Sequence, residues 1–222
     1  MRRCLICFEV IHAPLTINNF YKKPDVICEK CLTQIKQFES VKRCARCLKK
    51  LGPNEAVCLD CKWLEQRFRL VDQVVTVADY QGLMKSTIVQ YKFHLDIALS
   101  HVFAEIMPQL GRYDYLVPIP SPHEKKLMRR FDHIGEILKA KQIPFHPILE
   151  AKVRAKQSNL TKRERAKSDN PFLLVDRGYD LENKEILLID DIYTTGLTVH
   201  HAAELLFFRK VRKIRVLTFA RS

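Results

Sequence analysis

Four Cys-x-x-Cys pairs constrain the fold more than any other feature of this sequence. All eight cysteines stand within the first 61 of the 222 residues, and the rest of the chain contains none. The pairs are Cys4/Cys7, Cys28/Cys31, Cys44/Cys47 and Cys58/Cys61. Two thiolates separated by two residues can hold one metal ion from a single turn of backbone, and two such pairs complete a tetrahedron around zinc. The sequence therefore predicts two zinc sites, each made by four cysteines.

The spacing leaves the grouping of the pairs open. Sequential sites would use the first four cysteines and then the last four, whereas interleaved sites would mix the two halves. We favour the sequential grouping because each half then closes as its own loop. A site with four thiolates has no open position for catalysis, so both ions would be structural. A segment this small would need them in order to fold.

Three other uses of cysteine fit the pattern less well. A disulfide framework is rarely made of tight pairs alone. A redox Cys-x-x-Cys usually occurs once, at the start of a helix beside a strand, and this chain has four. Iron–sulfur ligation is possible in principle, but regular double pairs suit zinc better.

The rest of the chain alternates between strand and helix patterns. We expect residues 1–67 to form the zinc-binding module and residues 68–222 to form a second domain. Runs typical of strands occur at 74–78, 115–120, 145–149, 185–189 and 214–219. Helical spacing occurs at 83–93, 96–110, 131–140 and 198–208, and residues 62–70 fit a linker or a short helix. This alternation predicts an α/β fold with a mostly parallel sheet flanked by helices.

One segment combines a buried strand, two carboxylates, a small turn and a helix. In an open parallel sheet, ligands bind beyond the carboxyl ends of the strands, and a helix N-terminus offers unpaired N–H groups to a phosphate. The two carboxylates can accept hydrogen bonds from neighbouring ribose hydroxyls, and the glycine allows close backbone approach. For an isolated Asp-Asp pair, helix capping would be the simpler explanation, but the whole string is more specific. It predicts a ribose-phosphate site at Asp190, Asp191, Thr194, Thr195, Gly196 and Thr198.

The chain is strongly basic, with 38 Lys and Arg against 25 Asp and Glu, a net charge of +13. Such a charge favours anionic partners, although a basic surface without any nucleic-acid role would also account for it. Residues 152–170 are the most basic stretch and predict a long, mobile loop, which is usually functional. No apolar run reaches the length of a membrane span. The start, Met1-Arg2-Arg3 directly before Cys4, predicts no signal peptide.

The segment Ile186 to Thr198 closely resembles the signature with which type I phosphoribosyltransferases bind phosphoribosyl pyrophosphate (PRPP). Cysteine pairs followed by this signature resemble the ComF family of competence proteins, over essentially the entire chain. Tyr91-Lys92-Phe93 is similar to the family's Lys-Phe/Tyr element, and Val117-Pro118-Ile119-Pro120 is similar to its Val-Pro-x-Pro strand end.

The resemblance implies a phosphoribosyltransferase-type domain behind a zinc ribbon. The two acids would hold the ribose of magnesium-bound PRPP, and the loop would hold its 5-phosphate. Contacts to pyrophosphate would come from Lys92, Pro120 and Ser121. One element departs from the family: its Arg-Gly-Phe-Asn-Gln is here Arg129-Arg130-Phe131-Asp132-His133. We expect the histidines, His133, His200 and His201 included, to be surface or satisfied core residues.

The resemblance also implies a role in DNA uptake, on incoming single-stranded DNA beside a ComFA-type DNA-translocating ATPase. The chain would then lie in the cytoplasm, or at the inner face of the membrane where a partner holds it. We expect the zinc module to be the docking surface, because it is not needed to build the PRPP site. Candidate DNA contacts are Lys125, Lys126, Arg129, Arg130, Arg163 and Arg165, each of which could equally be a solvated surface charge.

An active phosphoribosyltransferase is the alternative function. A nucleophile would displace pyrophosphate through a cation-like sugar transition state, which electrostatics can stabilise without an acid or a base. The sequence shows no element that recognises a nucleobase, and it leaves the acceptor and the activity itself open.

Overall fold

The computed structural model of the chain describes residues 2–11, 25–122, 124, 128, 130–153, 170–175 and 177–222. Its centre is a four-stranded sheet in the order β1-β6-β5-β2, in which every neighbouring pair is parallel. The strands are β1 (Gln73–Asp79), β2 (Tyr115–Pro118), β5 (Glu185–Tyr193) and β6 (Lys213–Arg221). The predicted α/β class with a mostly parallel sheet is therefore confirmed.

The two central strands are buried on both faces, which explains their nearly continuous apolar sequence. On β5, Ile186 and Leu188 face one core cluster, and Leu187 and Ile189 face the other. The same alternation occurs on β6. A sheet covered on both sides needs helices on both sides, and the chain supplies them.

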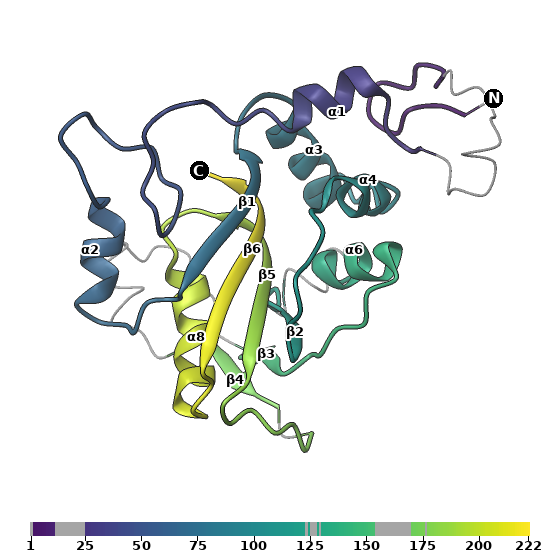
Figure 1. Cartoon of the computed structure of the whole chain (residues 1–222). Helices are drawn as coiled ribbons and strands as arrows, with labels where there is room; N and C mark the ends of the chain where they lie inside the picture. Colours follow the sequence, from purple (N-terminus) through teal and green to yellow (C-terminus); the bar gives the residue numbers. More distant parts are fainter. Residues whose placement is uncertain are drawn as a thin grey trace.

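Helices from different parts of the chain cover the two faces of the sheet (Figure 1). One face packs against α3 (Gly82–Phe93), α4 (Leu99–Ile106) and α6 (His133–Lys141). The other face packs against α8 (Leu197–Phe208). This arrangement places the loops that follow β2 and β5 side by side at the carboxyl edge of the sheet, since those two strands are parallel neighbours.

Three predicted elements differ from the structure. The strand expected at 145–149 is instead β3 (Leu149–Ala151), which pairs antiparallel with β4 (Phe172–Leu174) outside the main sheet. The strand expected to end at residue 189 continues through Asp190 and Asp191, because β5 pairs with β6 as far as Tyr193. The helix expected at 96–110 spans only α4, since Pro108 cannot continue it.

The N-terminal part of the chain contains two short helices, each of which begins directly after a cysteine. Cys28 precedes α1 (Glu29–Ile35), and Cys58 precedes α2 (Leu59–Glu65). The segment predicted as a linker or short helix at 62–70 therefore includes the second half of α2. We call residues 2–11 and 25–36 the first cysteine module and residues 42–66 the second cysteine module. In the part of the chain that the structure describes, no helix is both long and apolar enough to cross a membrane.

Candidate functional site

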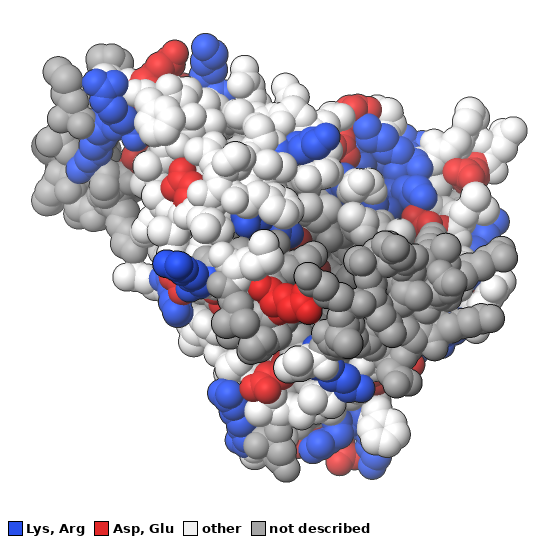
Figure 2. All heavy atoms as spheres, turned by 180° about the vertical axis from the view of Figure 1, so that it is seen from behind, with Lys and Arg blue, Asp and Glu red and all other residues white. Residues whose placement is uncertain are grey.

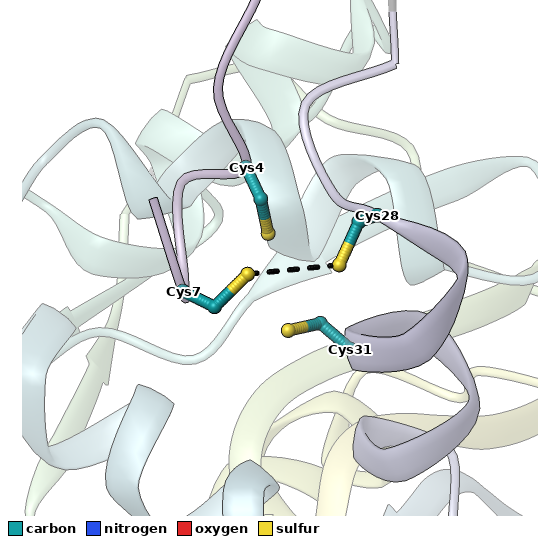
Figure 3. A group of neighbouring side chains, drawn as sticks. All are labelled: Cys4, Cys7, Cys28 and Cys31. Carbon is teal, nitrogen blue, oxygen red and sulfur yellow. Dashed lines mark hydrogen bonds between the residues drawn. The ribbon is translucent and has the colours of Figure 1, made fainter. Parts of the chain in front are cut away.

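The eight cysteines form two clusters in the order of the chain. Cys4, Cys7, Cys28 and Cys31 make the first cluster, and Cys44, Cys47, Cys58 and Cys61 make the second. Within each cluster the four sulfur atoms lie within 4.8 Å of one another. Figure 3 shows the four side chains of the first cluster pointing toward a common centre. The grouping is the sequential one that we favoured, and all eight cysteines are free of disulfides.

The sulfur positions fit a tetrahedral metal ion. Four sulfurs about 2.3 Å from zinc lie about 3.8 Å from one another. The sulfur atoms of Cys7 and Cys28 are 3.7 Å apart, those of Cys44 and Cys61 3.9 Å, and those of Cys47 and Cys58 3.4 Å. Both clusters can therefore bind a structural zinc ion through cysteine alone.

The two clusters differ in their surroundings. All four cysteines of the second cluster are buried, and they belong to the same core as β5, β6 and α8. In the first cluster Cys7 is exposed and Cys28 is half-buried, and its two buried cysteines pack in the core beside α3 and α4. The second cluster is thus part of the interior of the sheet domain, whereas the first is partly at the surface.

At the carboxyl edge of the sheet, Asp190 and Asp191 are the sixth and seventh residues of β5. The strand brings the Asp190 carboxylate into the interior, where only 9% of the residue is exposed. The backbone N–H of Asp191 donates to Oδ1 of Asp190 over 2.9 Å. The strand thus orients the two carboxylates relative to each other.

Two basic side chains from different helices converge on Asp191. Nζ of Lys92, in the last turn of α3, pairs with Oδ2 of Asp191. Nε2 of His133, the first residue of α6, lies 3.0 Å from the same oxygen. Lys92, one of the predicted pyrophosphate contacts, is therefore at the edge of the sheet beside the two acids.

The surroundings move the pKa values of the two acids in opposite directions. Burial, together with the charge of Asp191, raises the pKa of Asp190 to about 8. Burial also acts to raise the pKa of Asp191, but the hydrogen bond and charge of His133 and the charge of Lys92 outweigh it. The pKa of Asp191 therefore lies well below its usual range. The edge holds one ionised carboxylate and one carboxyl group that stays protonated near neutral pH.

His133 also connects the acids to the loop after β2. Its Nδ1 lies 2.9 Å from Oγ of Ser121, and its carbonyl accepts from the Tyr91 hydroxyl over 2.6 Å. Asp132 begins α6 by accepting a hydrogen bond from the backbone N–H of Gly135. The segment that departs from the ComF pattern thus builds part of the site.

Our prediction that His133 is merely a surface or satisfied core residue missed this role. His133 is buried, as expected for a core residue, but its ring contacts the carboxylate of Asp191. A usable signal was its place after Asp132, at the start of a helix that follows the proline-rich end of β2. His200 and His201 are buried on α8 and fit the core interpretation.

The turn of small residues follows β5 directly and leads into α8. Thr194 is exposed, Thr195 is half-buried, and Thr198 is exposed in the first turn of the helix. Gly196 has a φ of +83°, a conformation that favours glycine. The predicted phosphate-binding residues therefore lie at a helix N-terminus next to the two acids.

Most of the predicted DNA contacts lie outside the described residues. These are Lys125, Lys126, Arg129, Arg163 and Arg165. Arg130 is described, and it is exposed. The greater part of the predicted mobile loop, residues 154–169, also lies outside the described residues.

No family model matches the chain. Among solved structures, it is 16% identical to an allosteric regulatory enzyme of purine biosynthesis, with a TM-score of 0.36, over 56% of this chain and 25% of that one. It is 20% identical to a hypoxanthine phosphoribosyltransferase from Staphylococcus aureus, with a TM-score of 0.30, over 56% of this chain and 60% of that one. Overlaps this small assign neither an activity nor a ligand to the chain.

Curated relatives match almost the full chain. It is 22% identical to competence protein F of Haemophilus influenzae, over 97% of each chain. It is 25% identical to competence protein ComFC of Streptococcus pneumoniae, over 99% of this chain and all of that one. The identity to competence protein ComFC of Bacillus subtilis is 30%, over 99% of this chain and 95% of the relative. The chain therefore belongs to the ComFC family of competence proteins.

Proposed function

We propose that this protein acts in competence, in the uptake of DNA, and that the carboxyl edge of its sheet binds PRPP together with magnesium. One observation carries the second part. Two acids at the end of a buried strand lead directly into an exposed, hydroxyl-rich turn at a helix N-terminus. Acceptors for ribose hydroxyls and donors for a phosphate are thus adjacent, as a ribose phosphate requires.

Each part of the edge has a place in the proposed complex. Asp190 and Asp191 would accept hydrogen bonds from the ribose hydroxyls. The N–H groups at the start of α8 and the threonine hydroxyls would hold the 5-phosphate. Lys92 contacts Asp191 directly through its ion pair, and Ser121 is connected to Asp191 through the ring of His133. In the proposed complex they would meet the pyrophosphate, whose charge would compete with Asp191 for the Lys92 ammonium.

Calorimetric titration with PRPP and magnesium tests this proposal. We expect the wild type to bind and the variant Asp190→Asn/Asp191→Asn to lose binding, because the amide at position 191 cannot replace an ionised carboxylate at the ribose. Asp180→Asn is the matched control, since the Asp180 side chain is exposed and pairs only loosely with Lys184 at 3.5 Å. No binding by folded, zinc-loaded wild type would refute a PRPP site.

The family relationship and the net charge of +13 support a role on single-stranded DNA beside a ComFA-type ATPase. On the face in Figure 2, Lys and Arg side chains are scattered among acids, with a denser basic group toward the upper right. Arg130 adds an exposed guanidinium near the start of α6. This role would place the protein in the cytoplasm, or at the inner face of the membrane through the ATPase.

Fluorescence anisotropy of a labelled oligonucleotide at several salt concentrations tests the DNA role. A variant with glutamate at the four sites Lys125, Lys126, Arg129 and Arg130 should bind more weakly. Its salt slope should fall by about one for each phosphate contact that is lost. Lys210→Glu is the control, because Lys210 is 77% exposed and precedes β6, at the opposite edge of the sheet. An equal loss in the control, or no binding by the wild type at low salt, would contradict the proposal.

Transferase activity is the second candidate function, and the fixed charge of Asp191 favours it. Lys92 and His133 hold this carboxylate ionised in a nearly buried position. A fixed negative charge there can stabilise the positive charge that develops on a ribosyl group when pyrophosphate leaves. Release of pyrophosphate from PRPP only in the presence of an acceptor would support this function. A bound but unreactive PRPP with every nucleobase tried would favour a binding role.

A further inference from the structure

Arg221, the last residue of β6, is a buried cation with unusual partners. Only 3% of the residue is exposed. Its guanidinium donates to the carbonyls of Cys47, Tyr193 and Thr194 over 2.8, 3.0 and 2.9 Å, and to an oxygen of Ser222, the last residue of the sequence. Its Nη2 also lies 3.8 Å from the sulfur of Cys47. None of these partners is an Asp or Glu carboxylate.

The second cysteine cluster is a suitable counter-charge for this guanidinium. Buried cations are normally paired, because an unpaired charge is costly in a medium of low dielectric constant. Four thiolates around one zinc ion carry two net negative charges, and the sulfur of Cys47 is at hydrogen-bonding distance for sulfur. Arg221 thus has the position of an outer-shell partner of the metal site, which orients a ligand and balances its charge.

The same guanidinium holds the start of the 194–196 loop. Two of its bonds go to the carbonyls of Tyr193 and Thr194, at the point where β5 ends and the loop begins. The central guanidinium carbon of Arg221, Cζ, lies 5.2 Å from the centre of the Tyr193 ring. One side chain therefore contacts a cysteine of the second cluster and the first residue of the proposed phosphate-binding turn.

The Tyr193 ring and α2 form a second connection between the cluster and the loop. A methyl group added at Gly196 would lie 2.3 Å from the Tyr193 hydroxyl oxygen and 3.1 Å from Cδ1 of Leu64. Leu64 belongs to α2, the helix that also carries Cys61. The left-handed turn at Gly196 is thus packed directly against Tyr193 and against the helix that carries Cys61.

We propose that the second cysteine cluster maintains the shape of the 194–196 loop through Arg221, which makes Arg221 a positioning residue for the ribose-phosphate site. The meaning of this role for the protein rests on the proposed function, because the loop is where the phosphate would bind. The coupling between cluster and loop is a property of the fold. It can be measured with or without a ligand.

Zinc release to a colorimetric chelator tests the coupling in the full-length protein. We expect two phases: a fast one from the first cluster, where Cys7 is exposed, and a slow one from the buried second cluster. Arg221→Gln should accelerate the slow phase at least about tenfold, as expected when an outer-shell partner is lost. PRPP should slow the slow phase in the wild type, because coupling between two sites is reciprocal, and it should have no such effect on the variant.

Two further variants distinguish positioning from general destabilisation. Arg215→Gln, on the same strand β6 but half-exposed, should leave both phases unchanged. Gly196→Ala changes a residue of the loop and no residue of the second cysteine module, yet it should accelerate the slow phase, because the added methyl group displaces Tyr193 or Leu64. With cobalt in place of zinc, Arg221→Gln should also shift the thiolate-to-cobalt absorption of the second site, since a hydrogen bond to sulfur is removed.

The outcomes separate this proposal from the proposed function. If the wild type does not bind PRPP but Arg221→Gln and Gly196→Ala both accelerate the slow phase, the coupling stands and the PRPP site fails. If PRPP binds but the slow phase is the same in the wild type and in both variants, the coupling is refuted. Acceleration of both phases by Arg221→Gln, with an unchanged cobalt spectrum, would indicate only a less stable fold and would also refute it.

Discussion

The two cysteine modules contain the same backbone turn but pack against different parts of the protein. In the first, the N–H of Cys4 donates to the carbonyl of Glu9, and in the second the N–H of Cys44 donates to that of Lys49, both over 2.9 Å. Each turn has a residue other than glycine at a φ of 60°. The first module packs beside α3 and α4, and the second lies beside α8 and the edge strand β1 (Figure 1). The difference between them therefore comes from their neighbours.

One arginine in each module shows how those neighbours matter. Nη1 of Arg3 donates to the carbonyl of Phe8, and Nη1 of Arg43 donates to the carbonyl of Leu48, each over 3.0 Å. Arg3 is exposed, whereas Arg43 also pairs with Asp79 at the end of β1 over 2.8 Å, with both side chains largely buried. The second module is thus attached to the sheet by an ion pair, whereas Arg3 makes no ion pair with any residue that the structure describes.

This comparison changes the expected role of the modules. We predicted that the zinc module as a whole is a docking surface because it is not needed to build the site. The second module is connected to the proposed phosphate loop through Arg221. The argument that a module is not needed to build the site therefore applies at most to the first module. Cys7 and Phe8 of the first module are exposed, so we restrict the proposed docking surface to that module.

The largest expected effect is that of removing one zinc ligand from each module. Cys47→Ser should lower the free energy of unfolding by about 4 kcal/mol or more, because it disrupts a metal site inside the core. Cys7→Ser should cost less than half as much, since its cluster is partly at the surface. Urea unfolding with zinc analysis of each variant measures both. Equal losses would contradict a structural distinction between the modules.

The second test replaces the equivalent arginine of each module, Arg43 and Arg3, by glutamine. Arg43→Gln should destabilise the protein by about 3 kcal/mol, because it leaves the buried carboxylate of Asp79 without its main partner. Arg3→Gln should cost less than about 1 kcal/mol, since it removes one exposed hydrogen bond. The same unfolding experiment applies. A cost for Arg3→Gln as large as that for Arg43→Gln would show that the ribbon itself, and not its attachment, sets stability.

A third test concerns the acidic edge that the second module borders. Because the pKa of Asp190 is raised to about 8, the folded protein retains a proton that the unfolded chain has already lost above about pH 5. The stability that this bound proton contributes is therefore lost as the pH rises through this range, by about 3 kcal/mol between pH 5.5 and 8. Asp190→Asn should remove that slope, and Asp180→Asn should retain it. Parallel pH profiles of the wild type and Asp190→Asn would contradict the assignment.

The smallest expected effect comes from the two strained turns. Phe8 and Leu48 both have a φ of 60°, which glycine adopts without strain. Phe8→Gly should be neutral or stabilise by about 0.5 kcal/mol, because Phe8 is 59% exposed and its loss removes little burial. Leu48→Gly should be destabilising, since Leu48 is half-buried. Thermal unfolding distinguishes the two, and a destabilised Phe8→Gly would indicate that its ring is needed by the fold.

The sequence pattern of a single segment was enough to predict most strands of the central sheet. Four of the five predicted strands occur in the parallel sheet, because an apolar, β-branched run needs no distant information. The strand expected at 145–149 was wrong because β3 takes its register from β4, which follows more than twenty residues later. The continuation of β5 to Tyr193 likewise depends on Arg221, its partner on β6.

The site was predictable where one segment carries it and not where distant segments meet. Asp190 to Thr198 form a continuous string, and the structure places them together. His133 and Arg221 were missed, because each acts on a residue far away in the sequence. Arg221 and Cys47 are 174 residues apart, and no spacing rule connects them.

Hydrogen exchange of the zinc-loaded and zinc-depleted protein tests most directly whether the second module supports the site. Loss of zinc from the second cluster should deprotect the amides of residues 194–201 together with those of α2. Loss from the first cluster alone, removed first because Cys7 is exposed, should deprotect only α1 and its surroundings. Unchanged protection of residues 194–201 after both ions are removed would contradict the account.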